Sequence, residues 1–231
     1  MPGLSKSILD AIGNTPLLCL DGIFVKCEYL NPSGSIKARL AKYVVERAEK
    51  EGLLKHGMTI VEASSGNTGN ALSLVAAAKG YKMLVIMPEG YTNERIAISQ
   101  AFGAEVRLRG HYQANEALEY VRELSKKKKF WSPLQFDSEW NVEENCKWLG
   151  QEIIDQIPQN VTIDAILQGV GTGGTLIGVG QALRKHHNPD IKIFAMEPSE
   201  SAIISCHEVS DHLVEGIADG FVPGIYQRHQ T

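Results

Sequence analysis

Apolar positions in this chain recur at two spacings, and the two spacings alternate along most of its length. After residue 35 the spacing is three or four residues, which places side chains on one face of a helix, in a set made up of Ile36, Leu40, Val44 and Val45. Leu84–Met87, in contrast, is an unbroken apolar run of the kind found in strands that are buried on both faces. The pattern therefore predicts helices and buried strands in turn.

The same two patterns extend over the rest of the chain. Buried strands are predicted at Met58–Glu62, Lys82–Pro88, Glu105–Leu108, Ile163–Leu167 and Ile191–Ala195. Further helices are predicted at Ala71–Lys79, Asn93–Phe102, Gln113–Lys127, Val142–Ile157 and Leu176–His186, with Gly80 and Gly103 as C-terminal stops. Strands that are apolar on both faces and joined by helices indicate an α/β fold with a parallel sheet covered on both sides.

Composition narrows the class of protein. With 231 residues, 43% hydrophobic and 22% charged, the chain is long and apolar enough for one large folded domain or two smaller ones. A formal net charge of -4 gives no reason to expect nucleic acid or an anionic membrane as a partner. No apolar run approaches the ~20 residues of a membrane span, and the N-terminus lacks an apolar signal core, so we expect a cytoplasmic protein.

Cysteine and histidine spacing gives no sign of a metal centre. Four scattered cysteines lack CxxC spacing and are interpreted as free thiols in a reducing compartment: Cys19, Cys27, Cys146 and Cys206. Cys206, His207 and His212 do not match a standard zinc pattern. We therefore predict no metal.

One lysine lies where its chemistry can be unusual. The run Asn31-Pro32-Ser33-Gly34-Ser35-Ile36-Lys37 leads from turn residues into the first predicted helix, and Ser33 or Ser35 can cap its first turn. The Lys37 amine would lie near the positive end of that helix, where a partly desolvated lysine loses its proton more readily. A neutral amine can attack an aldehyde and later move a proton. Taken alone, Lys37 is better explained as a solvated lysine.

Two loops between a predicted strand and a predicted helix suit anions. The first, Ser64-Ser65-Gly66-Asn67-Thr68-Gly69, combines hydroxyls, an amide and flexible glycines at a helix N-terminus, an arrangement that suits a carboxylate or a phosphate. An ordinary tight turn with a cap is the structural alternative. The second, Gly169-Val170-Gly171-Thr172-Gly173-Gly174-Thr175, can hold a phosphate on its N–H groups, with Thr172 and Thr175 as hydroxyl donors.

The second loop leaves two kinds of cofactor open. It satisfies G-x-G-x-x-G, and Glu197 ends the following predicted strand, where a dinucleotide-binding fold places its ribose carboxylate. The loop alone therefore does not separate a nicotinamide cofactor from another phosphate-bearing one. A lysine at a helix start, an anion loop and a glycine-rich loop together favour pyridoxal phosphate, with its aldehyde on Lys37 and its phosphate on the glycine loop.

At this point the chain resembles the cysteine synthase / cystathionine β-synthase family of fold-type II pyridoxal phosphate enzymes. Family motifs follow one another in order over most of the chain: Ile12–Leu17, Asn31–Lys37, Ser65–Gly69, Met87–Glu89 with Glu94-Arg95, Gln135-Phe136, Glu152-Ile153, Gly169–Thr175, Glu197-Pro198 and Gly216-Ile217. The resemblance implies two doubly wound parallel-sheet domains with the cofactor between them. The smaller domain would comprise residues 38–140, and the larger one residues 1–37 plus 141–231.

The resemblance also implies roles for individual residues. Lys37 would form a Schiff base with the cofactor and act as acid and base, and Asn67 would hydrogen-bond the cofactor's 3′-oxygen. The phosphate would be bound by Gly171, Thr172, Gly173, Gly174 and Thr175. The substrate carboxylate would be bound by Ser64, Ser65, Gly66, Thr68 and Gln135.

The implied reaction is a β-replacement that makes L-cysteine from O-acetyl-L-serine, or O-phospho-L-serine, and sulfide through an aminoacrylate. The nearest alternative is another replacement or elimination on the same scaffold, such as cystathionine or diaminopropionate formation or a threonine-synthase-like reaction. Two alternatives come from other classes: a nucleotide-binding oxidoreductase that uses Gly169–Gly174 and Glu197, and a silent relative that binds a partner. Family members are often homodimers, and serine acetyltransferase is a candidate partner.

Two departures from the family pattern bear on these expectations. Within Ser138–Leu149, Asn141 stays, while Asn145 and Trp148-Leu149 replace a His and a Thr-Thr pair, which leaves the acyl donor open. The family also continues beyond the equivalent of Gly220–Pro223 and draws from that part the Ser or Thr that faces the pyridine nitrogen. No residue here takes that role, so the larger domain is predicted to be C-terminally incomplete. A sheet that lacks strands exposes an apolar edge, and we expect weak cofactor binding and poor turnover.

Overall fold

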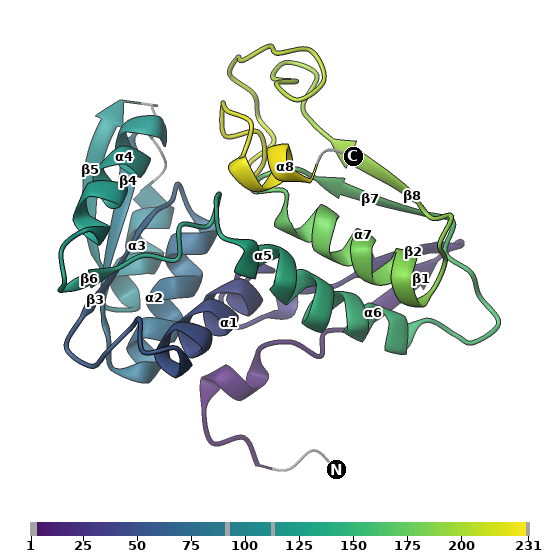
Figure 1. The fold of residues 1–231 in the computed structure, drawn as a ribbon, viewed down its shortest axis with the longest axis horizontal. Coiled ribbons are helices and arrows are strands. Elements are labelled where there is room, and N and C mark those ends of the chain that lie inside the picture. The colour runs from purple at the N-terminus through teal and green to yellow at the C-terminus, as the bar shows by residue number, and fades with distance from the viewer. Residues whose placement is uncertain (1–3, 91–92, 112–113, 230–231) are drawn as a thin grey trace. The chain divides into compact units, whose positions relative to one another are not determined.

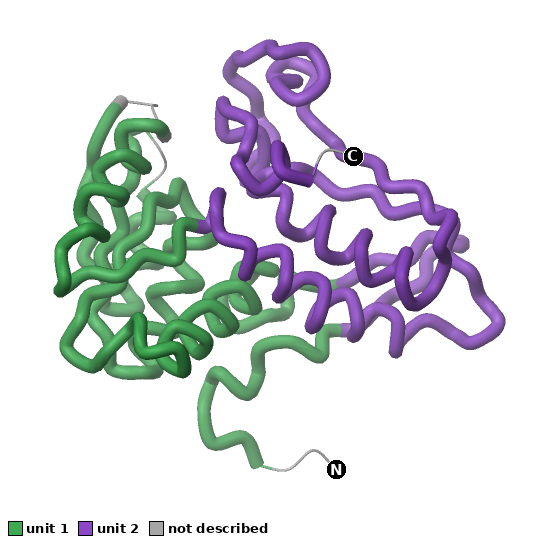
Figure 2. Tube along the Cα trace, viewed as in Figure 1, with its two compact units in different colours: residues 1–15, 27–134 green, residues 16–26, 135–231 purple. Residues whose placement is uncertain are grey.

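The computed structural model describes residues 4–90, 93–111 and 114–229. The chain forms two compact units: unit 1 contains residues 1–15 and 27–134, and unit 2 contains residues 16–26 and 135–231 (Figure 2). This division differs from the predicted domains chiefly because residues 1–15 and 27–37 belong to unit 1. The functional assignment of a smaller substrate-loop domain and a larger phosphate domain stays a prediction.

Unit 1 is built on a four-stranded parallel sheet with the strand order β5-β4-β3-β6. Its strands are β3 (Thr59–Ala63), β4 (Lys82–Glu89), β5 (Glu105–His111) and β6 (Phe130–Trp131). The central strands are buried on both faces, since Ile60 pairs with Met83 and Val61 pairs with Leu84, and all four side chains are shielded from solvent. This sheet forms the core of the unit.

Helices cover both faces of this sheet. α2 (Asn67–Lys79) joins β3 to β4, α3 (Asn93–Ala101) joins β4 to β5, and α4 (Ala114–Ser125) runs back to β6 at the other edge. Because parallel crossovers are right-handed, α2 and α3 lie on one face and α4 lies on the other (Figure 1). α1 (Lys37–Lys50) packs against α2. Two short 3-10 helices precede α1: η1 (Ile8–Ala11) and η2 (Glu28–Leu30).

Unit 2 contains a parallel strand pair and a hairpin. β7 (Ala165–Gly169) and β8 (Lys192–Met196) run parallel and are joined by α7 (Gly174–His186). β1 (Leu17–Leu20) and β2 (Ile23–Lys26) form an antiparallel hairpin. The parallel pair places the glycine-rich loop at the end of β7, directly before α7.

A second group of helices in unit 2 packs on α7. α5 (Glu139–Glu144), the π-helical segment η3 (Asn145–Gly150) and α6 (Gln151–Gln156) follow one another without a break. α5 and η3 pack against α7. A π-helical segment inside a helix often accompanies a functional site, and this one begins at Asn145, four positions after Asn141. The last described helix is α8 (Gly224–Arg228).

The predicted α/β class with parallel sheets is confirmed, and every predicted strand and helix appears with shifted ends. The largest shift concerns α2, which begins at Asn67 rather than at Ala71, so half of the first anion loop is helical. Gln113, the predicted start of one helix, lies outside the described residues. The prediction that both faces of the sheet are covered is confirmed for the sheet of unit 1. It is wrong for β7 and β8, where Leu167 is 66% and Phe194 51% exposed.

Sequence reasoning missed the β1–β2 hairpin, although a signal for it was present. Asp21 and Gly22 have φ values of 49° and 83°, the left-handed pair that a tight two-residue hairpin turn requires. Asp-Gly between two short apolar runs is the corresponding sequence pattern. The hairpin makes up most of residues 16–26, a segment that belongs to unit 2 although the residues before and after it belong to unit 1.

Candidate active site

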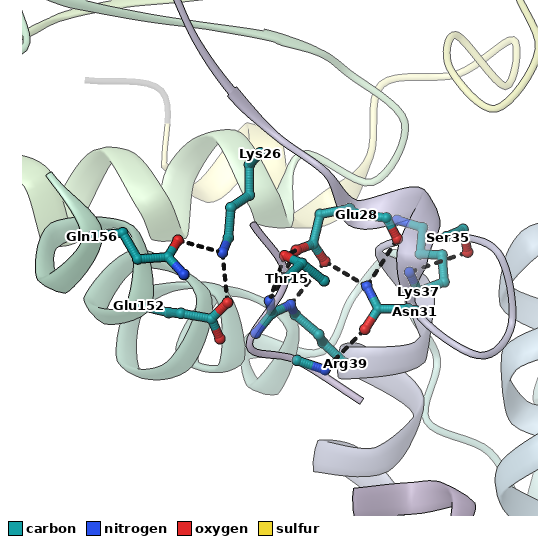
Figure 3. A network of polar contacts seen from close by, with 10 residues as sticks. Thr15, Lys26, Glu28, Asn31, Ser35, Lys37, Arg39, Glu152 and Gln156 are labelled. Carbon is teal, nitrogen blue, oxygen red and sulfur yellow. Dashed lines mark hydrogen bonds and ion pairs between the residues drawn. The ribbon is translucent and has the colours of Figure 1, made fainter. Parts of the chain in front are cut away.

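Lys37 is the first residue of α1, and the loop before it is held by short-range hydrogen bonds. Gly34 has a φ of 76°, a conformation that favours glycine, and its N–H donates to the carbonyl of Asn31 at 2.7 Å. The Lys37 N–H donates to Ser35 Oγ at 3.3 Å (Figure 3). The predicted serine cap is wrong, because the N-cap position of α1 is Ile36, which makes no side-chain cap hydrogen bond; Ser35 only accepts the N–H of the first helical residue. Lys37 lies at the electropositive end of the helix.

The Ser64–Gly69 run turns the chain from β3 into α2. Ser64 Oγ accepts hydrogen bonds from the N–H groups of Gly66 and Gly69, at 3.1 and 3.0 Å. Its oxygen thus holds the turn, and its hydroxyl hydrogen is what it can still donate to a ligand. Asn67 and Thr68 lie in the first turn of α2, where Asn67 is exposed and Thr68 is buried. The roles predicted for these residues stay predictions.

A cation that sequence reasoning did not assign to the site lies against this loop. Arg95 of α3 donates from Nη1 to the carbonyl of Ser65 at 2.8 Å. Its Cδ lies 3.4 Å from the place that a Cβ on Gly66 would take. A guanidinium in this place favours an anion at the loop. The Glu94-Arg95 pair was visible in the sequence, but a contact with a loop 30 positions earlier leaves no local pattern.

The Gly169–Thr175 run turns the chain from β7 into α7. Gly173 precedes α7 with a φ of 85°, and Gly174 is the first helical residue. Thr172 is buried, and its Oγ1 accepts hydrogen bonds from Asn141 Nδ2 at 2.9 Å and from the Gly174 N–H at 3.4 Å. Because both contacts go to the oxygen, the Thr172 hydroxyl hydrogen is left to donate to a ligand.

Close neighbours require glycine at several positions of this run. A Cβ on Gly171 would lie 2.8 Å from the carbonyl oxygen of Gly216, and a Cβ on Gly174 would overlap the Asn141 side chain. The glycines therefore carry no side chain that could shield the backbone at the start of α7. The first N–H groups there lack intrahelical acceptors, and the helix dipole is positive. These residues fit a phosphate group, which binds in this way at many helix N-termini.

A buried amide connects this loop to α5. Asn141 is 1% exposed, and its Nδ2 also donates to the carbonyl of Gln135 at 3.0 Å. Asn145 Nδ2 in turn donates to the carbonyl of Asn141 at 2.8 Å. Sequence reasoning noted Asn141 as a retained family residue but gave it no role. The structure shows that it fixes Thr172 and the backbone of Gln135 within unit 2.

Tyr226 of α8 borders the glycine-rich loop. The place that a Cβ on Gly173 would take lies 3.2 Å from Tyr226 Cβ and 3.4 Å from Cδ2 of its ring. The ring therefore packs directly on the loop. Burial raises the pKa of Tyr226, and the negative charge of Glu197 raises it further. The phenol therefore stays protonated at neutral pH, a neutral group beside the anion loop.

The Glu197 side chain forms hydrogen bonds with residues that follow it closely in the chain. Its carboxylate accepts hydrogen bonds from the N–H of Ile204 at 2.8 Å, the N–H of Ser205 at 3.1 Å and Ser205 Oγ at 3.0 Å. The oxidoreductase alternative needed this carboxylate for a ribose. Its use as a local acceptor removes the main support for that alternative.

Residues 4–90, 93–111 and 114–229 contain neither a metal-binding cluster nor a membrane-spanning helix. No group of three or more His, Cys, Asp and Glu residues there is arranged to hold a metal ion. Among the same residues, no helix combines the length and apolar character that crossing a bilayer needs.

Each unit assembles its own part of the predicted site. Unit 1 contains Lys37 and the predicted carboxylate loop with Ser64, Ser65, Gly66, Asn67 and Thr68. Unit 2 contains Gln135 and the predicted phosphate residues Gly171, Thr172, Gly173, Gly174 and Thr175. Within each unit, hydrogen bonds fix the backbone around these residues, as described above.

Comparison with known proteins gives consistent matches over nearly the whole chain. Residues 8–229 match the family model of the pyridoxal-phosphate dependent enzymes. The chain is 42% identical over 227 residues to the cysteine synthase of Staphylococcus aureus (strain Mu50 / ATCC 700699), an alignment that covers 94% of this chain and 73% of the relative.

Two solved structures share the fold of this chain over nearly its whole length. The crystal structure of O-ureido-L-serine synthase superposes with a TM-score of 0.91 at 39% identity, covering 98% of this chain and 73% of that one. A variant of a hydrogen sulfide-producing enzyme from Fusobacterium nucleatum, in complex with an alpha-aminoacrylate intermediate, superposes with a TM-score of 0.87 at 34% identity, covering 93% of this chain and 68% of that one.

Proposed function

This chain belongs to the pyridoxal-phosphate dependent enzymes of the cysteine synthase family, and from that membership we propose that it makes L-cysteine from O-acetyl-L-serine and sulfide. It is a pyridoxal phosphate-dependent, cysteine synthase-like enzyme of the β-replacement type. The observation that carries the finer proposal is the 42% identity to a cysteine synthase over 94% of the chain.

The cofactor's phosphate is assigned to the N–H groups and hydroxyls of Gly171–Thr175. When bound, pyridoxal phosphate supplies a ring that takes up the electron pair left on the substrate's α-carbon. The glycine run supports this assignment because its backbone is bare at a helix N-terminus and because Asn141 fixes the Thr172 oxygen. Asn67, exposed in the first turn of α2, is assigned to the cofactor's 3′-oxygen.

Lys37 is assigned the two tasks that need an amine. It holds the aldehyde carbon before the substrate arrives, and the released amine then moves the α-proton as a general base. Its place as the first residue of α1, after a loop fixed by Gly34 and Ser35, supports a defined backbone position from which the amine reaches the aldehyde.

The substrate carboxylate is assigned to the loop at the start of α2, together with Gln135. Ser64, Ser65, Gly66 and Thr68 offer hydroxyl and N–H donors there, and the Arg95 guanidinium against Ser65 favours the negative charge. With the carboxylate bound, the leaving group on the β-carbon is free to depart and a nucleophile can replace it.

A second candidate concerns the nucleophile. The 39% identity to O-ureido-L-serine synthase over 98% of this chain supports an enzyme that accepts an oxygen nucleophile in place of sulfide. The divergence at Asn145 and Trp148-Leu149 lies in the helical segment that packs on α7, near the residues assigned to the phosphate. A competition between donors and between nucleophiles therefore separates the two candidates.

A competition assay tests the proposal. The chain, reconstituted with pyridoxal phosphate, is given O-acetyl-L-serine or O-phospho-L-serine together with equal sulfide, homocysteine, ammonia and hydroxyurea, and products are identified by mass spectrometry. We expect O-acetyl-L-serine to be the better donor and cysteine to exceed each other product by about tenfold, a difference of ~1.4 kcal/mol in transition-state binding. A dominant ureido, cystathionine or diaminopropionate product would contradict cysteine synthesis while leaving the β-replacement class intact.

We also propose that the chain forms a homodimer. Leu167, Phe194 and Met196 of β7 and β8 are at least 42% exposed, and a patch of this kind is usually covered by association. Sedimentation equilibrium should give about twice the 25.3 kDa mass of one chain, and Phe194→Asp should shift the equilibrium toward the monomer. A monomer at every concentration would contradict the proposal. Contact with serine acetyltransferase stays a prediction.

A further inference from the structure

A fully buried arginine lies two residues after Lys37. Arg39 is 0% exposed, and its Nε and Nη2 donate to the two carboxylate oxygens of Glu28 at 2.8 and 2.9 Å (Figure 3). A guanidinium bonded to both oxygens of one carboxylate has a defined orientation as well as a strong interaction. The Glu28 carboxylate therefore fixes the first turn of α1, to which Lys37 also belongs.

The same carboxylate binds the other end of the lysine loop. Asn31, where the loop begins, donates from Nδ2 to Glu28 Oε2 and to the carbonyl of Glu28, both at 2.9 Å. Asn31 Oδ1 accepts the N–H of Gly13 at 2.9 Å. Thr15 Oγ1 donates to Glu28 Oε1 at 2.6 Å. Each Glu28 oxygen thus accepts two hydrogen bonds, which uses most of the acceptor capacity of the carboxylate.

This arrangement closes the loop that leads to Lys37. Asn31 stands six positions before the lysine and Arg39 two positions after it, and both bond one side chain. A shift of α1 along or around its axis would break the charged pair, and a shift of the loop would break the amide contacts. Since Arg39 is buried, water cannot replace what is lost.

We propose that Glu28 is a positioning residue of this enzyme, which through Asn31 and Arg39 holds the Asn31–Lys37 run so that the lysine amine meets the cofactor aldehyde in one orientation. The inference rests on the proposed role of Lys37. It adds that the reactivity of the amine depends on a carboxylate that touches neither the cofactor nor the substrate. A displacement of about 1 Å can lower the rate of such a positioned reaction by as much as about a hundredfold.

Three variants separate positioning from general stability. Asn31→Ala removes the loop contacts but keeps the Glu28–Arg39 pair, so it is expected to fold. Glu28→Gln removes the charge that Arg39 needs and is the stronger perturbation. Glu49→Gln is the matched control in the same unit. Glu49 lies at the other end of α1 from Lys37 and accepts hydrogen bonds from Lys79 Nζ at 2.8 Å and Tyr81 OH at 3.0 Å.

The first readout is the rate at which added pyridoxal phosphate becomes attached to Lys37, trapped with borohydride and located by peptide mass spectrometry. We expect Asn31→Ala to slow attachment about tenfold and Glu28→Gln to slow it further. Affinity for inorganic phosphate, which reports on the glycine-rich loop, should stay within about twofold, and Glu49→Gln should attach the cofactor at the parent rate. The second readout is amide hydrogen exchange without cofactor, where residues 31–37 should exchange faster in Asn31→Ala and β3 should not.

The outcomes separate this inference from the proposed function. If the parent chain attaches the cofactor at Lys37 and folded Asn31→Ala does so at the same rate with unchanged exchange, the positioning role is overturned and the proposed function stands. If the parent chain does not attach the cofactor at Lys37, both are overturned. If Glu28→Gln fails to fold, Asn31→Ala alone decides.

Discussion

Lys37→Ala is expected to abolish covalent attachment of pyridoxal phosphate and to lower β-replacement by at least about a thousandfold. General acid–base groups contribute about 10²–10⁴-fold to catalysis, and Lys37 is assigned both the attachment and the proton transfer. Borohydride reduction followed by peptide mass spectrometry measures the attachment, and cysteine formation from O-acetyl-L-serine and sulfide measures the turnover. The loop contacts of Gly34 with Asn31 do not involve the Lys37 side chain, so the variant is expected to fold.

Lys42 provides a matched control for this prediction. It lies in the same helix, and its Nζ donates to the carbonyl of Leu9 at 3.0 Å, so it is a partly buried lysine with a structural contact. Lys42→Ala should keep the covalent attachment and change cysteine formation by no more than about twofold, or ~0.4 kcal/mol, because the Lys42 amine bonds the carbonyl of Leu9, outside the lysine loop. Cofactor attached to Lys42, or full turnover by Lys37→Ala, would contradict the assignment.

The fold could be predicted from the sequence where its signals are local. The recurrence of Leu40 and Val44 located α1, and the left-handed glycines Gly80 and Gly103 ended α2 and the α3 segment as expected. The start of α2 could not be located in this way, because Asn67 and Thr68 are weak helix formers that the sequence assigns to a loop. The helix begins there because Ser64 accepts the Gly66 and Gly69 N–H groups and holds the turn.

The candidate site was predicted residue by residue but not as a network. Lys37, Ser65 and Thr172 stand in motifs that can be read along the chain. Their supports come from distant positions: Arg95 bonds the loop at Ser65, and Asn141 bonds Thr172 across 31 positions. Such pairs depend on which helices pack together, and that information lies in the tertiary structure rather than in local spacing.

The same argument applies to the ion pair behind Lys37. Glu28 and Arg39 are separated by 11 positions with a loop between them, so helical spacing does not bring them together. An arginine in the first turn of a predicted helix is also expected to face solvent. The structure instead buries Arg39, because Glu28 and Thr15 satisfy its guanidinium. The spacing of hydrophobic residues along the chain does not reveal a buried polar network of this kind.

Gly174→Ala is expected to weaken cofactor binding by about ten- to a hundredfold and to destabilise the fold by ~1–3 kcal/mol, the usual cost of overpacking. Its Cβ would overlap Asn141 Oδ1 and would lie 2.8 Å from Asn141 Nδ2. Asn141 is buried and holds Thr172 and the Gln135 carbonyl, so it moves only by giving up those hydrogen bonds. Titration with pyridoxal phosphate and with inorganic phosphate measures the binding loss, and urea unfolding without cofactor measures the stability.

Gly180→Ala separates a loss of phosphate contacts from overpacking alone. Gly180 lies in the same helix, and its Cβ would approach Ile193 Cδ1 at 2.5 Å, the flexible end of a side chain that can turn aside. This variant should bind phosphate as the parent does. Combining Gly174→Ala with Asn141→Ala removes the overlap, so the double variant should be more stable than additivity of the two single variants predicts. Additive effects on stability, or parent-like phosphate affinity in Gly174→Ala, would show that Asn141 does not hold the loop in a phosphate-binding conformation.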